Sequence, residues 1–165
     1  MRGQVAEMEE RTIYKSDKIV ITLAEMEDTE ARRLLHEKIK AFNDANSPHH
    51  RAVRATGATP LDVWVRDLQG RVIGGLTADT YWGWLDIDDF WLAEPLRGHG
   101  LGTQMIAAVE KEAVRRGCRQ AQVKTFSFQA QHFYEKCGYR VVGMLENYPP
   151  GATLYWLRKD FSATT

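Results

Sequence analysis

Residues 97–103, Arg-Gly-His-Gly-Leu-Gly-Thr, place three alternate glycines directly before a segment with helical periodicity. Glycine lets the backbone approach a bulky anion closely. The first N–H groups of a helix have no intrahelical acceptor, and they lie at the positive end of the helix dipole. Backbone amides arranged in this way bind phosphate groups. We therefore predict a pyrophosphate site at residues 97–103.

The glycine spacing disfavours two common phosphate-binding folds. It is G-x-G-x-G, whereas the dinucleotide-binding fingerprint is G-x-G-x-x-G, and the sequence has no G-x-x-x-x-G-K-[ST] motif. A P-loop fold and a dinucleotide-binding fold are therefore not expected.

Two segments resemble the motifs of one family. The pattern Arg97-x-x-Gly100-x-Gly102 resembles the acyl-CoA-binding motif of the GNAT superfamily of N-acetyltransferases. Residues 130–139, with Tyr134 four residues after the alanine, resemble the second motif of that superfamily. The resemblance covers most of residues 19–158 and implies a bacterial-type, single-domain N-acetyltransferase that uses acetyl-CoA as cosubstrate.

The resemblance also implies which residues hold the cosubstrate. The backbone around Leu92, Ala93 and Glu94 would bind the pantetheine arm. The pyrophosphate would be held by the loop residues Arg97, Gly98, His99, Gly100, Leu101, Gly102 and Thr103. Ser127 stands where many relatives carry an asparagine that contacts pantetheine, so this chain departs from the pattern there.

Amine acetylation needs a base, because an alkyl ammonium has a pKa of about 10 and must lose a proton before it attacks the thioester. In similar enzymes an acidic side chain on the strand before the motif assists, at either of two offsets, and these offsets fall on Asp86 and Asp89. Asp88 lies between them and is a further candidate. The alternative is that these aspartates cap loops or pair with Arg51 or Arg54.

The leaving thiolate needs a proton donor, since a free thiol has a pKa of about 8–9. By resemblance Tyr134 is the general acid; the alternative is an ordinary buried tyrosine. The acceptor pocket could be aromatic and acidic, and so suited to a cationic amine, or the same aromatic residues could belong to the core: Tyr81, Trp82, Trp84 and Trp91.

The predicted acceptor is a primary amine of a small molecule. Two other functions stay open at this point. One is acetylation of protein lysines or N-termini, and the other is a regulatory module that binds acyl-CoA without turnover.

An α/β fold must position these residues. The hydrophobic periodicity predicts helices at about 29–46, 104–116 and 128–137, with Ser127 as a candidate cap, and strands at 19–23, 61–66, 71–81, 85–92, 119–126, 139–145 and 152–158. The expected fold is GNAT-like: a mixed, mostly antiparallel central sheet with a splayed strand pair and flanking helices.

The strand before the glycine loop shows a change of phase. Leu85 and Ile87 alternate with aspartates, but after Asp89 the apolar positions shift by one residue. An inserted residue in a strand ladder causes such a shift. We predict a bulge near Asp88 and Asp89, and by resemblance this strand diverges from its neighbour to admit the acyl chain.

Composition limits the partners. Lys+Arg and Asp+Glu balance at 22 each, so no global basic field favours a nucleic-acid partner. No apolar run approaches the roughly 20 residues of a membrane helix. Cys118 and Cys137 have no metal-ligand spacing, so no metal is indicated. We expect a cytoplasmic monomer or homodimer, with a flexible leader at 1–16 and one domain at 17–165.

Overall fold

The computed structural model describes residues 10–161. Residue contacts divide the chain into two units, residues 1–52 and 53–165, and each is described by itself. Among the described residues, no helix has the length and apolar character needed to cross a membrane.

The first unit contains a hairpin and a helix. Strands β1 (Glu10–Lys15) and β2 (Val20–Ala24) pair in antiparallel fashion, and α1 (Thr29–Asn46) follows. The Asp28 carboxylate accepts a hydrogen bond from the N–H of Ala31 at 2.9 Å, which caps the helix. Residues 10–15 of the expected leader form β1, and residues 1–9 lie outside the described residues, so the leader stays a prediction. That residues 17–165 form one domain stays a prediction.

Helix α2 (Pro48–Arg54) precedes the sheet of the second unit. The strands of this sheet are β3 (Thr59–Pro60), β4 (Val63–Arg66), β5 (Val72–Tyr81), β6 (Trp84–Leu92), β7 (Gln120–Phe126), β8 (Arg140–Glu146) and β9 (Thr153–Asp160). Their order is β3-β5-β6-β7-β9-β8, with β4 also paired to β5. Only the β6–β7 pair is parallel among the described strands. The mixed, mostly antiparallel sheet confirms the predicted fold class.

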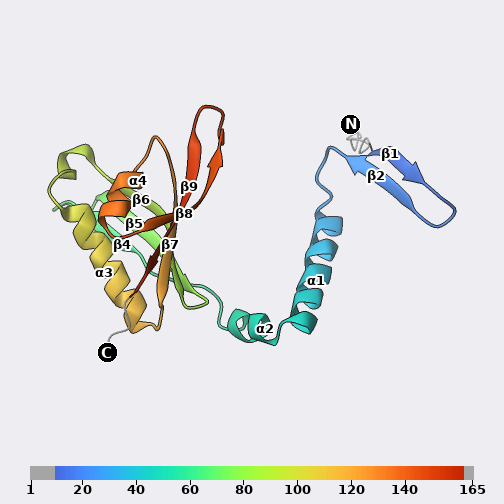
Figure 1. The fold of residues 1–165 in the computed structure, drawn as a ribbon, viewed down its shortest axis with the longest axis horizontal. Helices are drawn as coiled ribbons and strands as arrows, with labels where there is room; N and C mark the ends of the chain where they lie inside the picture. The colour runs from blue at the N-terminus through green and yellow to red at the C-terminus, as the bar shows by residue number, and fades with distance from the viewer. Residues whose placement is uncertain (1–9, 162–165) are drawn as a thin grey trace. The chain divides into compact units, whose positions relative to one another are not determined.

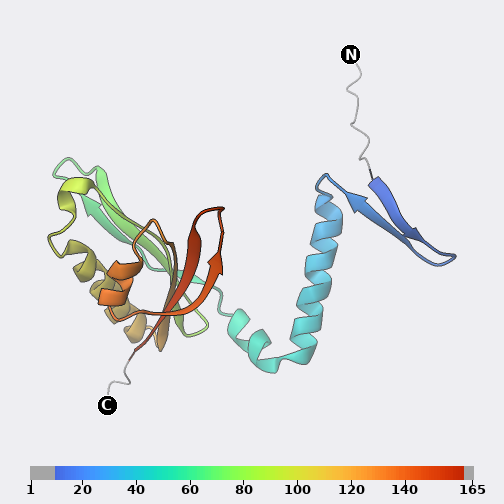
Figure 2. The same ribbon diagram turned by 45° about the horizontal axis from the view of Figure 1, so that its top comes forward.

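Two helices cover one face of this sheet. Figures 1 and 2 both show α3 (Leu101–Arg115) and α4 (Gln131–Lys136) on the same side of the strands. Alternate strand residues point toward these helices, so one face of the sheet becomes the core. The buried residues are Leu76, Ala78, Leu85, Ile87, Met105, Ile106, Val109, Ala113, Cys118, Ala121, Val123, Tyr134, Tyr139 and Leu157.

The predicted bulge is present in β6. Leu76 pairs with Phe90 and Ala78 pairs with Ile87, so Thr77 alone faces both Asp88 and Asp89. The N–H of Asp89 donates to the Thr77 hydroxyl at 3.1 Å instead of to a ladder carbonyl. The extra residue changes the direction of the strand at this point.

The predicted divergence of two strands is also present. Parallel pairing of β6 with β7 runs from Trp84–Gln120 to Ile87–Val123, and no later pair forms between them in the described chain. Strand β7 nevertheless continues to pair with β9 as far as Phe126–Leu154. The last residues of β6 therefore present a backbone edge that β7 does not cover.

The two helices begin at other residues than predicted. Helix α3 begins at Leu101, three residues earlier than the hydrophobic periodicity indicates, with Gly100 as its N-cap. Helix α4 begins at Gln131, not at residue 128, and the Ser127 cap is wrong. The Ser127 hydroxyl accepts instead from the N–H of Thr153 at 3.1 Å. This bond ties the β7–α4 connection to β9.

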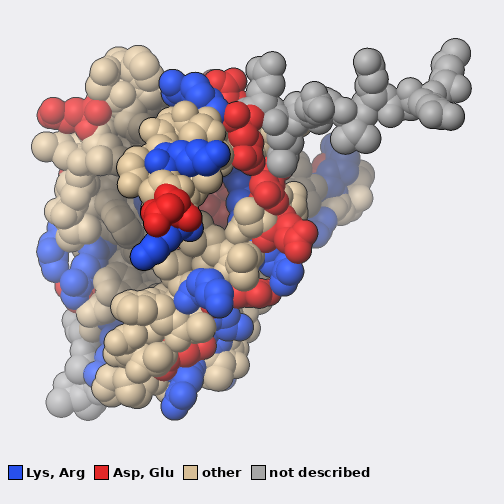
Figure 3. All heavy atoms as spheres, turned by 90° about the vertical axis from the view of Figure 1, so that its right-hand side faces the viewer, with Lys and Arg blue, Asp and Glu red and all other residues tan. Residues whose placement is uncertain are grey.

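Charges of both signs are intermingled on the surface. Figure 3 shows lysine and arginine side chains scattered among acidic ones over the face drawn there. This distribution agrees with the equal numbers of basic and acidic residues.

Replacing a fully buried leucine should measure how much the sheet core contributes. Leu157 in β9 is 0% exposed, so Leu157→Ala is expected to lower the free energy of unfolding by about 2–5 kcal/mol through lost burial and cavity formation. Leu145→Ala, at a 56% exposed position on the neighbouring β8, is the matched control and should change it by less than about 1 kcal/mol. Denaturant unfolding measures both, and equal losses would contradict the placement of the core.

Candidate active site

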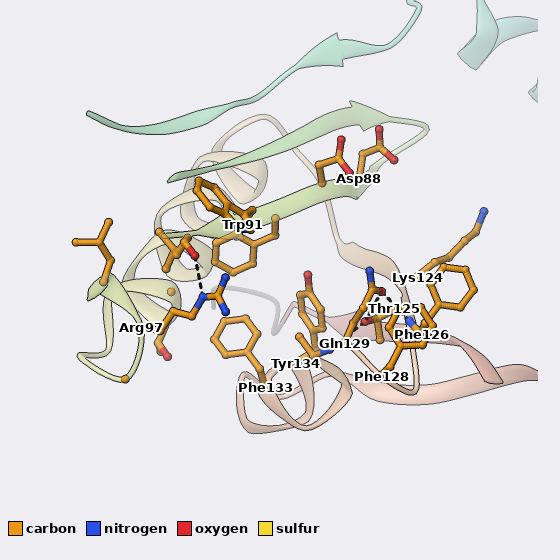
Figure 4. A pocket seen from close by; sticks show the side chains of 18 of the residues that line it. Asp88, Trp91, Arg97, Lys124, Thr125, Phe126, Phe128, Gln129, Phe133 and Tyr134 are labelled. Carbon is orange, nitrogen blue, oxygen red and sulfur yellow. Dashed lines mark hydrogen bonds between the residues drawn. The ribbon is translucent and has the colours of Figure 1, made fainter. Parts of the chain in front are cut away.

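A cleft of about 820 Å³ lies where β6 and β7 diverge. Residues 88–92 of β6 form one wall, and residues 124–126 of β7 lie in the other. The glycine loop and the first turn of α3 stand at one end, and α4 contributes the floor (Figure 4). The cleft is therefore a direct product of the bulge and of the early end of parallel pairing.

The glycine loop has the backbone expected of an anion site. Gly98 and Gly100 have φ values of +79° and +76°, which residues with a side chain rarely adopt. An added Cβ at either residue would meet no atom within 4 Å, so the requirement for glycine comes from the backbone conformation. Gly100 caps α3 without a side-chain hydrogen bond. The first-turn amides of α3 are thus available to a pyrophosphate, and the loop fits that of coenzyme A.

Gly102 has a different role. A Cβ there would lie 3.2 Å from the Phe133 ring and 3.4 Å from the Phe90 ring. These two rings contact each other with centroids 5.5 Å apart. The absent side chain lets the first turn of α3 pack closely against β6 and α4, which fixes the loop relative to the cleft.

Arg97 connects the loop to the end of β6. Its Nε donates to the carbonyl oxygen of Leu92 at 2.8 Å. This bond holds the guanidinium at the loop end of the cleft (Figure 4). A positive charge at this position would add to the attraction of the loop amides for a phosphate.

Tyr134 is a buried side chain of α4 that lines the cleft. The residue is 5% exposed, and Figure 4 shows its hydroxyl pointing into the cleft. Edge-on contacts with Phe133 and Tyr139, at centroid distances of 5.2 and 5.8 Å, hold the ring. Burial, followed by the nearby Cys137, raises the pKa of Tyr134 to about 12. The phenol therefore stays protonated at neutral pH and can donate a proton.

The predicted acidic residues separate into two positions. Asp89 lines the cleft together with Asp88, whereas Asp86 does not line it. Asp86 lies before the divergence, where it is still in register with Gln122 of β7. Of the two predicted bases, the structure brings only Asp89 to the cleft with Tyr134.

Only some of the residues predicted to bind the cosubstrate line the cleft. The cleft is lined by Leu92, Arg97, Gly98, Gly100, Gly102 and Thr103, and it is not lined by Ala93, Glu94, His99, Leu101 or Ser127. The N–H of Ala93 donates to Ile73 at 3.0 Å and its carbonyl accepts from Leu96 at 2.9 Å. Both backbone groups of Ala93 are thus paired within the protein, and binding of the pantetheine arm around Leu92, Ala93 and Glu94 stays a prediction.

The residues at the far end of the cleft belong to no sequence motif. Lys124, Phe126, Phe128 and Gln129 line it there. The Phe126 and Phe128 rings stack with centroids 5.3 Å apart and an angle of 4° between their planes. The Gln129 side-chain oxygen accepts from the Phe126 N–H at 2.8 Å and so shapes the turn before α4. No motif indicated these residues; only the register of β7 against β6 would have done so.

The aromatic pocket predicted for the acceptor is mostly absent from the cleft. Of the four predicted aromatic residues, Trp91 lines it and the other three do not. Tyr81 and Trp82 stack on each other with centroids 4.5 Å apart, at the turn between β5 and β6. Trp84 lies beneath the Arg158 guanidinium, 5.3 Å from the ring centroid.

Residues 23–139 match the family model described as "Acetyltransferase (GNAT) family". The chain belongs to the GNAT acetyltransferase family. It is an N-acetyltransferase, and acetyl-CoA is its cosubstrate.

Individual relatives and solved structures similar to this chain are also acetyltransferases. The chain is 38% identical over 130 residues to blasticidin-S acetyltransferase of Streptomyces morookaense, covering 74% of this chain and 96% of that protein. A crystal structure of an acetyltransferase from Bacillus cereus is 29% identical, with a TM-score of 0.73 and coverage of 83% of this chain and 96% of that one. A proposed streptothricin acetyltransferase from Bacillus anthracis, solved with acetyl coenzyme A, shares the fold at 22% identity, with a TM-score of 0.51 and coverage of 57% and 58%.

A substitution of the glycine at the N-cap of α3 tests whether the loop amides bind acetyl-CoA. Gly100→Ala is expected to lower the free energy of unfolding by about 1–2 kcal/mol, because alanine is strained at positive φ. It should also weaken acetyl-CoA binding about fivefold or more, because the shifted backbone misdirects the loop amides. Isothermal titration calorimetry measures the affinity.

Gly151→Ala is the matched control. Gly151 has a φ of +83° and open space around it, but it lies in the turn between β8 and β9. Gly151→Ala is expected to lose about as much stability as Gly100→Ala and to keep the wild-type affinity for acetyl-CoA. Equal weakening of binding by both variants would remove the loop from the cosubstrate site.

The raised pKa of Tyr134 predicts a loss of stability at alkaline pH. Below about pH 10 the tyrosine is neutral in both the folded and unfolded states. Between the ordinary pKa of about 10 and the folded value of about 12, the unfolded state loses the proton first, so the free energy of unfolding falls with rising pH, by roughly 3 kcal/mol in total.

Denaturant unfolding at pH 9 and pH 11 tests this. Tyr134→Phe should show a smaller fall than the wild type, whereas Tyr148→Phe, at a residue 56% exposed, should keep the wild-type fall. Tyr139, whose pKa burial also raises, remains in both variants and accounts for a residual fall. The same fall in all three proteins would contradict the burial of the Tyr134 hydroxyl.

Proposed function

We propose that the enzyme transfers the acetyl group of acetyl-CoA to a primary amine of a small molecule by direct attack on the thioester. The observation that carries the proposal is the shared cleft: the protonated Tyr134 hydroxyl, the Asp88 and Asp89 carboxylates and the glycine loop all line one space. A proton donor, proton acceptors and an anion site in one cleft are the groups that this reaction needs.

The cosubstrate would lie with its pyrophosphate at Arg97, Gly98, Gly100 and Thr103, and its arm would follow the uncovered edge of β6. An extended ligand can add to such an edge as an extra strand does. This placement directs the thioester toward the middle of the cleft, where Tyr134 lies.

The reaction would balance without a further reagent. The amine nitrogen attacks the thioester carbon, the C–N bond forms and the C–S bond breaks. The carboxylate on the acidic strand takes the proton from the amine, directly or through water, and Tyr134 gives its proton to the departing thiolate. Between the two predicted bases we assign this role to Asp89, since it lines the cleft, with Asp86 as the alternative.

Two observations support a small-molecule acceptor. One relative, which matches 74% of this chain, is named for blasticidin S, so an amine-bearing antibiotic is the first class to test. The cleft is also partly walled by aromatic side chains from β6 and from the β7–α4 turn, including Trp91 and Phe128. Aromatic side chains along a cleft can contact a small cationic acceptor.

Release of free thiol from acetyl-CoA tests the proposal. The acceptor panel contains blasticidin S, streptothricin-type and aminoglycoside antibiotics, amino acids, polyamines, arylalkylamines and a lysine peptide. Turnover of a small amine is expected. Turnover of the lysine peptide alone would favour a protein substrate, and acetyl-CoA binding without any turnover would favour a regulatory module; either result would contradict the proposal.

Removing the Tyr134 hydroxyl should slow the chemistry and leave binding intact. Tyr134→Phe is expected to lower kcat about 100-fold, the lower end of general acid catalysis. The acetyl-CoA affinity measured by calorimetry should change less than about twofold, because the loop is untouched. Tyr148→Phe is the control and should keep wild-type turnover. Wild-type kcat in Tyr134→Phe would remove this residue from the mechanism.

A further inference from the structure

A carboxylate and an ammonium face the same side of the sheet just beyond the last β6–β7 pair. Parallel pairing ends at Ile87 and Val123, so the same register continued by one residue would pair Asp88 with Lys124. Ile87 and Val123 are both buried on the face covered by α3 and α4. Because side chains alternate along a strand, Asp88 and Lys124 point to the opposite face.

These two charges do not neutralise each other. Both residues line the cleft and are exposed, and Figure 4 shows them on the two separate strands. No ion pair within 4.0 Å joins Lys124 to Asp88 or to any other carboxylate of residues 10–161. The divergence of the strands thus leaves a gap with opposite charges on its two sides.

Lys124 is held in this position by its neighbour on β9. Its ammonium lies 5.1 Å from the ring centroid of Trp156, its cross-strand partner. The Trp156 indole N–H donates to the side-chain oxygen of Gln122 at 3.0 Å, which fixes the ring. A cation–π contact positions an ammonium but leaves it able to donate hydrogen bonds to an anion.

We infer that the acceptor is an amine that also carries a carboxylate, with its ammonium drawn to Asp88 and its carboxylate bound by Lys124. This inference rests on the proposed function and specifies its substrate class. The glycine loop occupies one end of the cleft, so the cosubstrate enters from there and the opposite end, with Lys124, is left for the acceptor. An acceptor with both charges gives each side chain a partner of opposite charge, whereas a simple cationic amine would meet the Lys124 charge unfavourably.

Matched acceptor pairs test the inference. Each pair is a carboxylate-bearing amine from the panel and its carboxamide, which keeps the size and removes the negative charge. The wild type is expected to prefer the carboxylate about tenfold or more in kcat/KM, mainly through KM, because a charged hydrogen bond is lost in the carboxamide.

Variants of the two charged residues should respond differently. Lys124→Met should raise KM for the carboxylate at least about tenfold, leave the carboxamide nearly unchanged and so abolish the preference. Asp88→Asn should raise KM for both members of a pair and keep their ratio. Lys111→Met, at an exposed position on α3, is the matched control and should keep the wild-type ratio.

The outcomes separate this inference from the proposed function. Equal use of carboxylate and carboxamide by the wild type, or an unchanged preference in Lys124→Met, would overturn the inference while small-amine acetylation still stands. No turnover of any small amine would overturn both. Acetyl-CoA affinity, measured in parallel, must stay at the wild-type value in Lys124→Met, which shows that a change in the preference does not come from misfolding.

Discussion

The early end of one parallel strand pair is the constraint on which the site depends. Pairing between β6 and β7 stops at Ile87–Val123, because the extra residue at Asp88 and Asp89 turns β6 away while β7 stays paired to β9. A sheet with complete pairing would have no room for a ligand between these strands. The divergence creates the cleft, uncovers a backbone edge and separates the charges of Asp88 and Lys124.

The helices convert this gap into a site with two distinct ends. With Gly100 as its N-cap, α3 has first-turn amides that are available to a ligand. Gly102 allows this first turn to pack against Phe90 and Phe133. Helix α4, packed on the same core, places Tyr134 in the middle of the cleft with its hydroxyl in an apolar setting. The cosubstrate end is therefore built mainly from backbone, which suits a pyrophosphate, and the other end is built from side chains.

Some parts of this arrangement leave a local signal in the sequence and could be predicted from it. The glycine loop must be glycine for backbone reasons, and the bulge shifts the hydrophobic alternation at Asp89, so both could be read from neighbouring residues. Lys124 could not, because its importance comes from its register against a strand about 36 residues earlier. The Ser127 cap failed for a similar reason: its hydroxyl bonds to Thr153 of a distant strand, and no local pattern records that contact.

Hydrogen exchange of the backbone amides with and without acetyl-CoA tests the central claim most directly. The account predicts slower exchange on binding in two segments far apart in sequence, residues 88–92 and 98–103, with no change in the β8–β9 turn at 147–152. Binding that is confirmed by calorimetry, but that protects neither the β6 edge nor the glycine loop, would contradict the assignment of the cleft as the acetyl-CoA site.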